Sequence, residues 1–328
     1  MDAGHRETDE VIGKMEKKIA QIYGDVEKEL QTNLDNYLER FKVEDEARRK
    51  MLENGEISQK QYNAWRREQL MTETRLKEMR ETIAQDLHNS NNIARSVVNG
   101  YMPEVYAINH NFGTFQVEYD ALVDTSYTLY DRQTVERLMR EDPDLLPPLS
   151  DSKKEAKAAA KDIKWQSQQF NAAMTKSILM GDSIQTMAAR ISNDLGVSNM
   201  NAAVRYARTA ATGAQNAGRV DSYERAQKMG IELEQEWLAT LDNRTRDEHR
   251  DLDGQHVPVG EPFEVDGEEI RYPGDPSAPG YLVWNCRCTL VPKLKSLDQS
   301  DAPRDNRLGD MRYDDWKNEH KKGDVNGD

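Results

Sequence analysis

Two cysteines separated by one residue are the most reactive side chains of this sequence. Cys286 and Cys288 flank Arg287, and the chain has no other cysteine. A disulfide across a single residue is strained and uncommon, and two cysteines alone cannot complete a tetrahedral zinc site. Thiolate and imidazole are suitable zinc donors, so His249, with His256 or an aspartate as fourth ligand, could complete one. The spacing argues against zinc, because paired cysteines in such sites usually have roughly two to four intervening residues.

Two other interpretations fit the same region. Asp242, His249 and Cys286 could form a catalytic cluster, with a Cys–His nucleophile or an Asp–His general base, and Arg287 would favour the thiolate. No nucleophile elbow, phosphate-binding loop or metal-hydrolase helix motif accompanies them. In the structural interpretation these polar side chains hold turns, and the cysteines are small buried apolar residues. We therefore expect no catalytic residue and no enzyme activity, and keep a structural zinc ion as the candidate cofactor.

The composition favours helices over a deep sheet core. The chain has 328 residues, of which 37% are hydrophobic and 32% charged, and its mean hydropathy is -0.91. Such values suit long helices that each bury a narrow stripe. No apolar run is long enough to span a bilayer, and residues 1–18 lack the apolar core of a secretory signal. We expect synthesis in the cytoplasm and no membrane partner.

The net charge limits the role of nucleic acid. The formal charge is -14 and the sequence pI is about 5.1. Binding to DNA through the overall field requires positive charge that replaces phosphate counterions. An acidic chain is thus disfavoured as a general DNA coat, although a local basic face could still contact DNA.

The first hundred residues predict two long helices. One apolar stripe has steps of three or four residues throughout: Val11, Met15, Ile19, Ile22, Val26, Leu30, Leu34, Tyr37 and Phe41. Asn54-Gly55 predicts the turn, and Ser58 with Gln61 forms a capping box that opens a second helix to about residue 100. An internal helical hairpin is favoured, and docking of the stripe onto another subunit is the alternative.

Further elements follow along the chain. Phe112-Gly113-Thr114-Phe115 predicts a turn, and residues 128–140 return to helical spacing before a Pro-rich connector at 142–148. Helices are expected at 152–179, 184–195 and 199–228. From Ile231 short apolar stretches alternate with turns, two of which are the Asp-Gly pairs at 253–254 and 266–267, typical of hairpins.

These elements predict an α+β protein, with an elongated, mostly helical N-terminal region and a small mixed α/β C-terminal module. The predicted divisions are a long antiparallel helical pair, a mixed connector, a helical linker domain, the module, and a polar, loosely ordered tail. Their limits are 1–103, 104–150, 151–200, 201–295 and 296–328.

A series of short motifs between Val204 and Pro292 resembles the phage Mu protein F-like domain of phage head morphogenesis proteins. The series contains Ala207-Arg208-Thr209, Asn216, Gly218, Trp237, Ala239 and Thr240. Further along come Asp242, Arg244-Thr245-Arg246, His249, Asp253-Gly254, Pro273-Gly274-Asp275-Pro276 and Asn285-Cys286-Arg287-Cys288. Each motif is weak alone, and the ordered set is specific. The helices upstream resemble phage minor capsid proteins more loosely.

This resemblance implies a minor capsid protein that acts in procapsid and virion assembly. Its expected location is the virion, in the capsid interior near the portal vertex, and its expected partners are the portal protein and other capsid or scaffold proteins. Some relatives contact DNA, so double-stranded DNA is a further candidate partner.

The resemblance also assigns structural roles to motif residues. The residues concerned are Arg208, Thr209, Trp237, Asp242, Arg246, His249, Asp253, Gly254, Pro273, Gly274, Asp275, Asn285, Cys286, Arg287 and Cys288. Arg208 is expected to pair in bidentate fashion with Asp242 or another carboxylate of the module. The rival function is a packaged nuclease or transferase, which predicts that Asp242, His249 and Cys286 converge on an open cleft. The structural interpretation predicts that they are buried with their hydrogen bonds satisfied.

Overall fold

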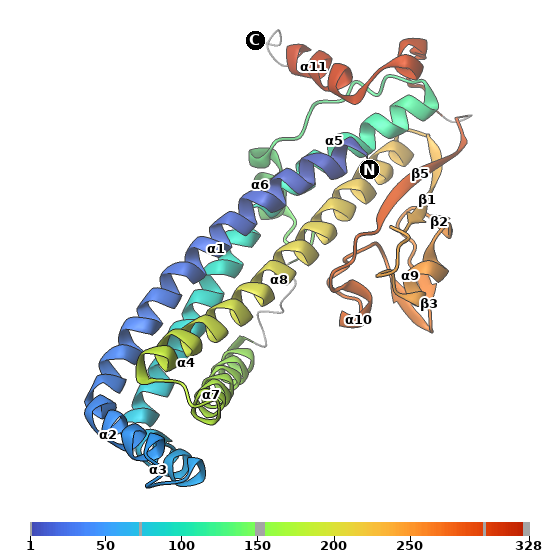
Figure 1. Ribbon diagram of the computed structural model, residues 1–328. Helices are drawn as coiled ribbons and strands as arrows, with labels where there is room; N and C mark the ends of the chain where they lie inside the picture. The colour runs from blue at the N-terminus through green and yellow to red at the C-terminus, as the bar shows by residue number, and fades with distance from the viewer. Residues whose placement is uncertain (1, 72–73, 148–154, 298–299, 324–328) are drawn as a thin grey trace. The chain divides into compact units, whose positions relative to one another are not determined.

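The computed structural model describes residues 2–71, 74–147, 155–297 and 300–323, and it confirms the α+β class (Figure 1). The helices are α1 (Ala3–Leu38), η1 (Glu39–Phe41), α2 (Lys42–Glu53), α3 (Gln59–Met71), α4 (Thr74–Asn99), α5 (Met102–Ala121), α6 (Arg132–Glu141), α7 (Glu155–Leu179), α8 (Ile184–Lys228), α9 (Asp247–Leu252), α10 (Gly280–Val283), η3 (Asn306–Asp310) and α11 (Tyr313–Gly323). The strands are β1 (Glu232–Leu238), β2 (His256–Pro258), β3 (Phe263–Val265), β4 (Glu268–Ile270) and β5 (Thr289–Ser296).

The contacts group the chain into two compact units. Unit 1 comprises Met1–Met15, Val97–Leu149 and Arg205–Asp328. Unit 2 comprises Glu16–Ser96 and Ser150–Val204. Each unit is assembled from segments far apart in the sequence, so a linear division of the chain does not describe them. The candidate site lies in unit 1.

Unit 2 is a bundle whose core holds most of the predicted apolar stripe. Leu30, Leu34 and Phe41 are buried there against side chains of α4, α7 and α8. The Asn54-Gly55 turn is present, with Gly55 at a φ of 76°, and the capping box forms, since the backbone N–H of Ser58 donates to Gln61. The chain's own helices therefore cover the stripe, and the alternative prediction that it docks onto another subunit is wrong.

Helix α8 is continuous where the sequence predicted two helices. Asn199, expected near a helix start, is 2% exposed within α8. Its side-chain amide donates to the carbonyl of Leu195 at 2.9 Å and its oxygen accepts from Gln166 of α7 at 2.7 Å. The polar side chain is thus satisfied inside the bundle and does not end the helix.

Helix α5 replaces the turn predicted at Phe112–Phe115, and this prediction is wrong. The helix is buried on nearly every face, so its sequence lacks the 3.6-residue alternation that marks a surface helix. Gly113 serves close packing here: a Cβ at this position would collide with Ser222 of α8. In the sequence, a buried helix that lacks periodicity and contains a glycine has the same features as a turn.

The strands of unit 1 form two small sheets. An antiparallel sheet has the order β2-β1-β5, and β3 pairs with β4 in a hairpin. Along β1 the buried side chains alternate with more exposed ones, as in a strand with one face on the core: Leu233, Gln235 and Trp237 are all under 5% exposed. The Asp266-Gly267 hairpin turn is confirmed, with both φ angles positive. Asp253-Gly254 instead links α9 to β2.

The polar tail contains a packed helix, so its prediction as loosely ordered is wrong. Trp316 of α11 is 0% exposed, and its indole N–H donates to the Glu118 carboxylate of α5 at 2.6 Å. Lys317 forms an ion pair with Glu7 at 2.7 Å. A few aromatic residues at helical spacing anchor this segment despite its polar composition.

Candidate functional site: a buried Cys–His cluster in the C-terminal module

His249 lies at the centre of the candidate site. It belongs to the short helix α9 and is 3% exposed. Its Nε2 lies 2.9 Å from the carbonyl oxygen of Leu282. A carbonyl only accepts, so this contact requires the proton on Nε2, and the Nδ1 lone pair is then free to accept. That lone pair is directed at the two cysteines.

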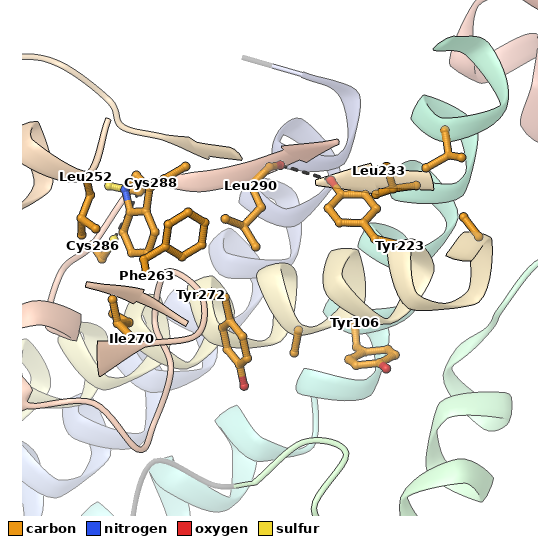
Figure 2. Close-up of a cluster of buried hydrophobic side chains, with 14 of the residues drawn as sticks. Tyr106, Tyr223, Leu233, Leu252, Phe263, Ile270, Tyr272, Cys286, Cys288 and Leu290 are labelled. Atoms are coloured by element: carbon orange, nitrogen blue, oxygen red, sulfur yellow. Dashed lines mark hydrogen bonds between the residues drawn. The ribbon is translucent and has the colours of Figure 1, made fainter. Parts of the chain in front are cut away.

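Cys286 and Cys288 reach His249 from the segment between α10 and β5. The Sγ atom of Cys288 lies 3.2 Å from His249 Nδ1, and that of Cys286 lies 3.6 Å from the same atom. Both side chains are 3% exposed, and Figure 2 shows them at one end of the apolar cluster, near Leu252. Asn285 has a φ of 57°, a left-handed conformation that asparagine tolerates better than most residues. This bend turns the chain so that both thiols enter the site.

The pKa values of the two thiols are shifted in opposite directions. Burial raises the pKa of Cys286. The hydrogen bond from Cys286 lowers the pKa of Cys288, although burial opposes the shift. The indole N–H of Trp237, which is 0% exposed and makes no conventional hydrogen bond, also lowers it.

Asp242 is held by arginine outside this cluster. Its two carboxylate oxygens accept from the Arg287 guanidinium at 2.7 and 2.8 Å, which is the bidentate geometry of a strong pair. These bonds hold the pKa of Asp242 well below its ordinary value. Arg287, and not Arg208, forms the bidentate pair with Asp242. That Arg208 pairs with another carboxylate of the module stays a prediction. The structure thus brings His249 and Cys286 together, whereas Asp242 is engaged elsewhere.

His256 does not join the cluster. It lies on β2, where its Nδ1 is 2.7 Å from the Glu234 carboxylate and its side chain is 42% exposed. Among the residues that the structure describes, the group able to hold a metal ion comprises His249, Cys286 and Cys288. The prediction of His256 as a fourth ligand is wrong, because His256, which lies opposite Glu236 in the β1–β2 pairing, forms its ion pair with Glu234.

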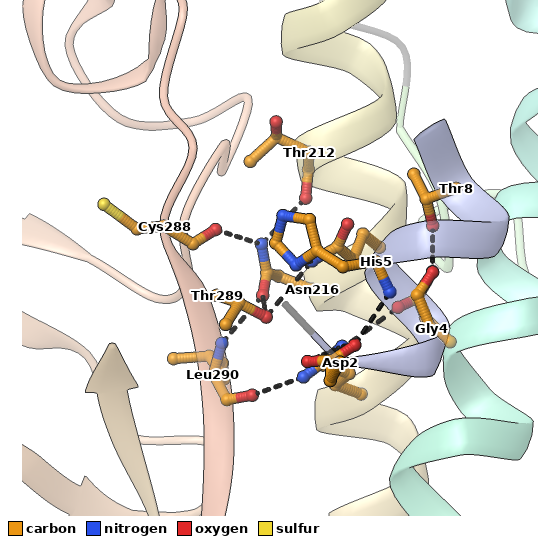
Figure 3. Close-up of polar contacts among 12 residues, drawn as sticks. Asp2, Gly4, His5, Thr8, Thr212, Asn216, Cys288, Thr289 and Leu290 are labelled. Atoms are coloured by element: carbon orange, nitrogen blue, oxygen red, sulfur yellow. Dashed lines mark hydrogen bonds and ion pairs between the residues drawn. The ribbon is translucent and has the colours of Figure 1, made fainter. Parts of the chain in front are cut away.

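Helix α8 fixes the cysteine segment through one buried amide. Asn216 is 0% exposed, and its amide donates to the carbonyls of Pro273 at 3.1 Å and Cys288 at 3.4 Å. Its oxygen accepts from the backbone N–H of Leu290 at 3.0 Å (Figure 3). Thr212 adds a bond to the Cys286 carbonyl at 3.0 Å. Sequence reasoning placed Asn216 in the motif series without a role, because its partners are backbone atoms that leave no sequence signal.

The start of the chain is tied to the same strand. Arg219 of α8 is 0% exposed and binds both carboxylate oxygens of Asp2 at 2.9 Å. It also donates to the carbonyl of Leu290 at 2.9 Å. Figure 3 shows Asp2, at the start of α1, beside Leu290 of β5. Asp2, which directly precedes α1, therefore binds the same arginine of α8 that holds β5.

The remaining motif residues stabilise turns. Asp253 accepts the backbone N–H of Ala239 at 2.8 Å. Asp275 is 1% exposed and accepts five bonds, which come from the backbone and guanidinium of Arg271 and from Ser277. Gly274 has a φ of 82°, and a Cβ there would lie 2.5 Å from the backbone nitrogen of Gly213.

A solvent-facing hollow of about 410 Å³ opens onto the cluster. Four arginines contribute to its lining, together with the three cluster residues and neutral polar side chains: Arg208, Thr240, Arg244, Thr245, Arg246, His249, Asn285, Cys286, Arg287 and Cys288. The Arg246 guanidinium lies 3.2 Å from His249 Nε2 and donates to the carbonyl of Trp284 at 2.8 Å. The hollow is therefore positively charged and suits anionic groups.

Residues 168–291 match the family model described as phage Mu protein F like protein. This segment is a Mu F-like domain. The match confirms the resemblance that the motif series indicated, and it extends upstream to include the second half of α7 and all of α8. The Cys–His cluster and the arginine-lined hollow both lie within the Mu F-like domain.

Two curated relatives share part of the chain. The minor head protein GP7 of Bacillus phage SPP1 is 33% identical over 124 residues, which are 36% of this chain and 38% of that protein. An NAD(+)–arginine ADP-ribosyltransferase EFV of Enterococcus faecalis is 33% identical over 132 residues, or 39% of this chain and 27% of that protein. The chain thus spans well under half the length of either relative. No solved structure matches, and no described helix is long and apolar enough to cross a membrane.

Proposed function

We propose that this chain is a minor head protein that acts in phage head assembly at the portal vertex. The observation that carries the proposal is the Mu F-like domain at residues 168–291, together with the similarity to minor head protein GP7. The proposed location is the capsid interior near the portal, after synthesis in the host. The proposed partners are the portal protein and other capsid or scaffold proteins.

The arrangement of the motif residues supports a structural role. Asn216, Asp253 and Asp275 bind backbone atoms and so define the path of the chain. Asp242 is bound by Arg287 and is not part of the lining of the hollow, so the predicted catalytic combination of Asp242, His249 and Cys286 is not assembled. A general base must lie within hydrogen-bond reach of its proton, and here the arginine occupies it.

The similarity to the ADP-ribosyltransferase covers only a part of each protein. It covers 27% of that protein, so most of the transferase has no counterpart here. The shared length, 132 residues, is close to that of the Mu F-like domain. We infer that the two proteins share this domain and that the transferase activity depends on other parts of that relative.

The contact with the portal must use a surface other than the first apolar stripe, since that stripe is buried within the chain. The Mu F-like domain exposes several large apolar side chains, among them Leu241 at 60% and Tyr281 at 46%. Such residues are the usual anchors of protein contacts when they lie on an otherwise polar surface. DNA contact, if it contributes, would be confined to the arginine-lined hollow because the chain's net charge is -14.

Co-purification with the portal protein of the same phage tests this proposal. The intact chain and the untagged portal oligomer are co-expressed and passed over affinity and size-exclusion columns. We expect the chain to elute with the portal. Leu241→Glu should reduce its recovery at least about tenfold if Leu241 is an anchor of roughly 1.4 kcal/mol or more.

Val43→Glu is the matched control, because Val43 is 78% exposed and lies outside the Mu F-like domain. Its recovery should equal that of the unmodified chain. A chain that elutes apart from the portal, with normal circular dichroism, would contradict the proposed contact.

A further inference from the structure

The three converging donors have the geometry of a zinc site. In tetrahedral coordination, zinc–sulfur bonds of about 2.3 Å and zinc–nitrogen bonds of about 2.0–2.1 Å place nitrogen and sulfur ligands about 3.6 Å apart. His249 Nδ1 lies 3.2 and 3.6 Å from the two sulfurs, and all three ligand atoms lie within 4.8 Å of one another. A shift of a few tenths of an ångström at Cys288 brings both nitrogen–sulfur distances to this value.

The surroundings orient the three donors as metal ligands. His249 donates its Nε2 proton to the Leu282 carbonyl, which directs the Nδ1 lone pair into the cluster. Backbone carbonyls commonly fix metal-binding histidines in this way. The backbone N–H of Cys288 approaches the Cys286 sulfur at 3.4 Å, and the Trp237 indole N–H is buried without a conventional partner. These N–H groups can stabilise thiolate charge.

The single intervening residue is accommodated by the backbone. Asn285 adopts its left-handed conformation immediately before Cys286, and Arg287 points outward to Asp242. Both cysteine side chains can then face the same point. This arrangement removes the objection that the spacing raised in the sequence.

We propose that Cys286, Cys288 and His249 bind one zinc ion, whose fourth ligand is an oxygen donor from the arginine-lined hollow. His249 belongs to α9, and the cysteines precede β5. The ion therefore joins two segments that are distant in sequence, because His249 lies 37 residues before Cys286 and 39 residues before Cys288. Three of the strands near the cluster have only three residues, and such short elements gain a fixed arrangement from a link of this kind. The hollow gives the three ligand residues, which contribute to its lining, access to solvent.

Zinc content of the untagged full-length chain, purified without chelator, tests the proposal. After incubation with equimolar zinc and dialysis, elemental analysis should give about one zinc per chain. Cys288→Ser and His249→Ala should each lower this to below roughly a tenth of that value. His256→Ala is the matched control, because His256 is an exposed histidine paired with Glu234, and this variant should keep its zinc.

A second measurement covers the case in which the ligand variants do not fold. The unmodified chain is loaded with Co²⁺, and the absorption spectrum should show thiolate-to-cobalt charge transfer and visible bands of tetrahedral intensity. Alkylation of both cysteines should be slow until a chelator is added. A folded, unmodified chain that retains no zinc and gives an octahedral cobalt spectrum would overturn the proposal. Loss of zinc in His256→Ala would show that the ligand set is wrong.

Discussion

Replacing Asn216 with alanine should loosen unit 1 while leaving unit 2 intact. The substitution removes three bonds of 3.1 Å or shorter, to the carbonyls of Thr212 and Pro273 and from the N–H of Leu290. A neutral hydrogen bond contributes about 1 kcal/mol net, and a buried group that loses its partner costs about 1–3 kcal/mol. Because Asn216 is 0% exposed, water cannot replace these bonds without entering the core. We expect a loss of about 3–4 kcal/mol.

Amide hydrogen exchange is the suitable assay for this variant. A two-unit chain need not unfold in one step, so a global denaturation curve would mix both units. Exchange of the slowest amides in β5 reports the opening of unit 1, and a loss of 3–4 kcal/mol speeds it by roughly a hundredfold or more. Lys228→Ala, at an exposed end of the same helix, should change the rate less than about threefold. A rate in Asn216→Ala within threefold of the unmodified chain would refute the reasoning.

Three further variants test other parts of unit 1. Gly218→Ala should destabilise unit 1 by about 1–3 kcal/mol, measured by exchange of the β5 amides, because the new Cβ would lie 2.5 Å from the Tyr106 carbonyl oxygen of α5. An exchange rate equal to that of the unmodified chain would disprove this close packing. Trp316→Ala should cost about 3–5 kcal/mol and increase proteolysis of the tail, whereas unchanged proteolysis would show that α11 is not anchored there. Burial opposes ionisation of Asp275, but bonds from Arg271 hold its pKa below the ordinary value. The ionised carboxylate therefore stabilises the fold at pH values above its ordinary pKa, and this stability is lost as the pH falls through the lowered pKa. Asp275→Asn should be about 2–3 kcal/mol less stable than the unmodified chain at pH 7. A stability difference between the two chains that does not narrow below about pH 4 would contradict this.

Patterns along one element were sufficient to predict many of the helical segments and the turn of the β3–β4 hairpin. The stripe from Val11 to Phe41 and the capping box at Ser58 depend on neighbouring residues, and both form as predicted. Asp266-Gly267 likewise needs only its own backbone conformation. The helix α5 was missed because its burial on nearly all faces removes the periodicity that signals a helix.

Contacts between segments that are distant in the chain could not be predicted from the sequence. Asp242 had several arginines nearby in sequence, and only the turn before β5 brings Arg287 to it. His256 was predicted as a ligand from its residue type alone, whereas in the structure it forms an ion pair with Glu234. The convergence of His249 with both cysteines was correctly suggested by residue chemistry, and the bend at Asn285 that permits it could not be deduced from the spacing.

The most direct test of the proposed role is the protein content of purified phage particles. Quantitative mass spectrometry of procapsids and mature virions should detect this chain in both, at a few copies per particle and far below the major capsid protein. Particles made without its gene should contain none and should be defective in assembly. Absence of the chain from both particle types, in preparations that contain the portal protein, would contradict the account.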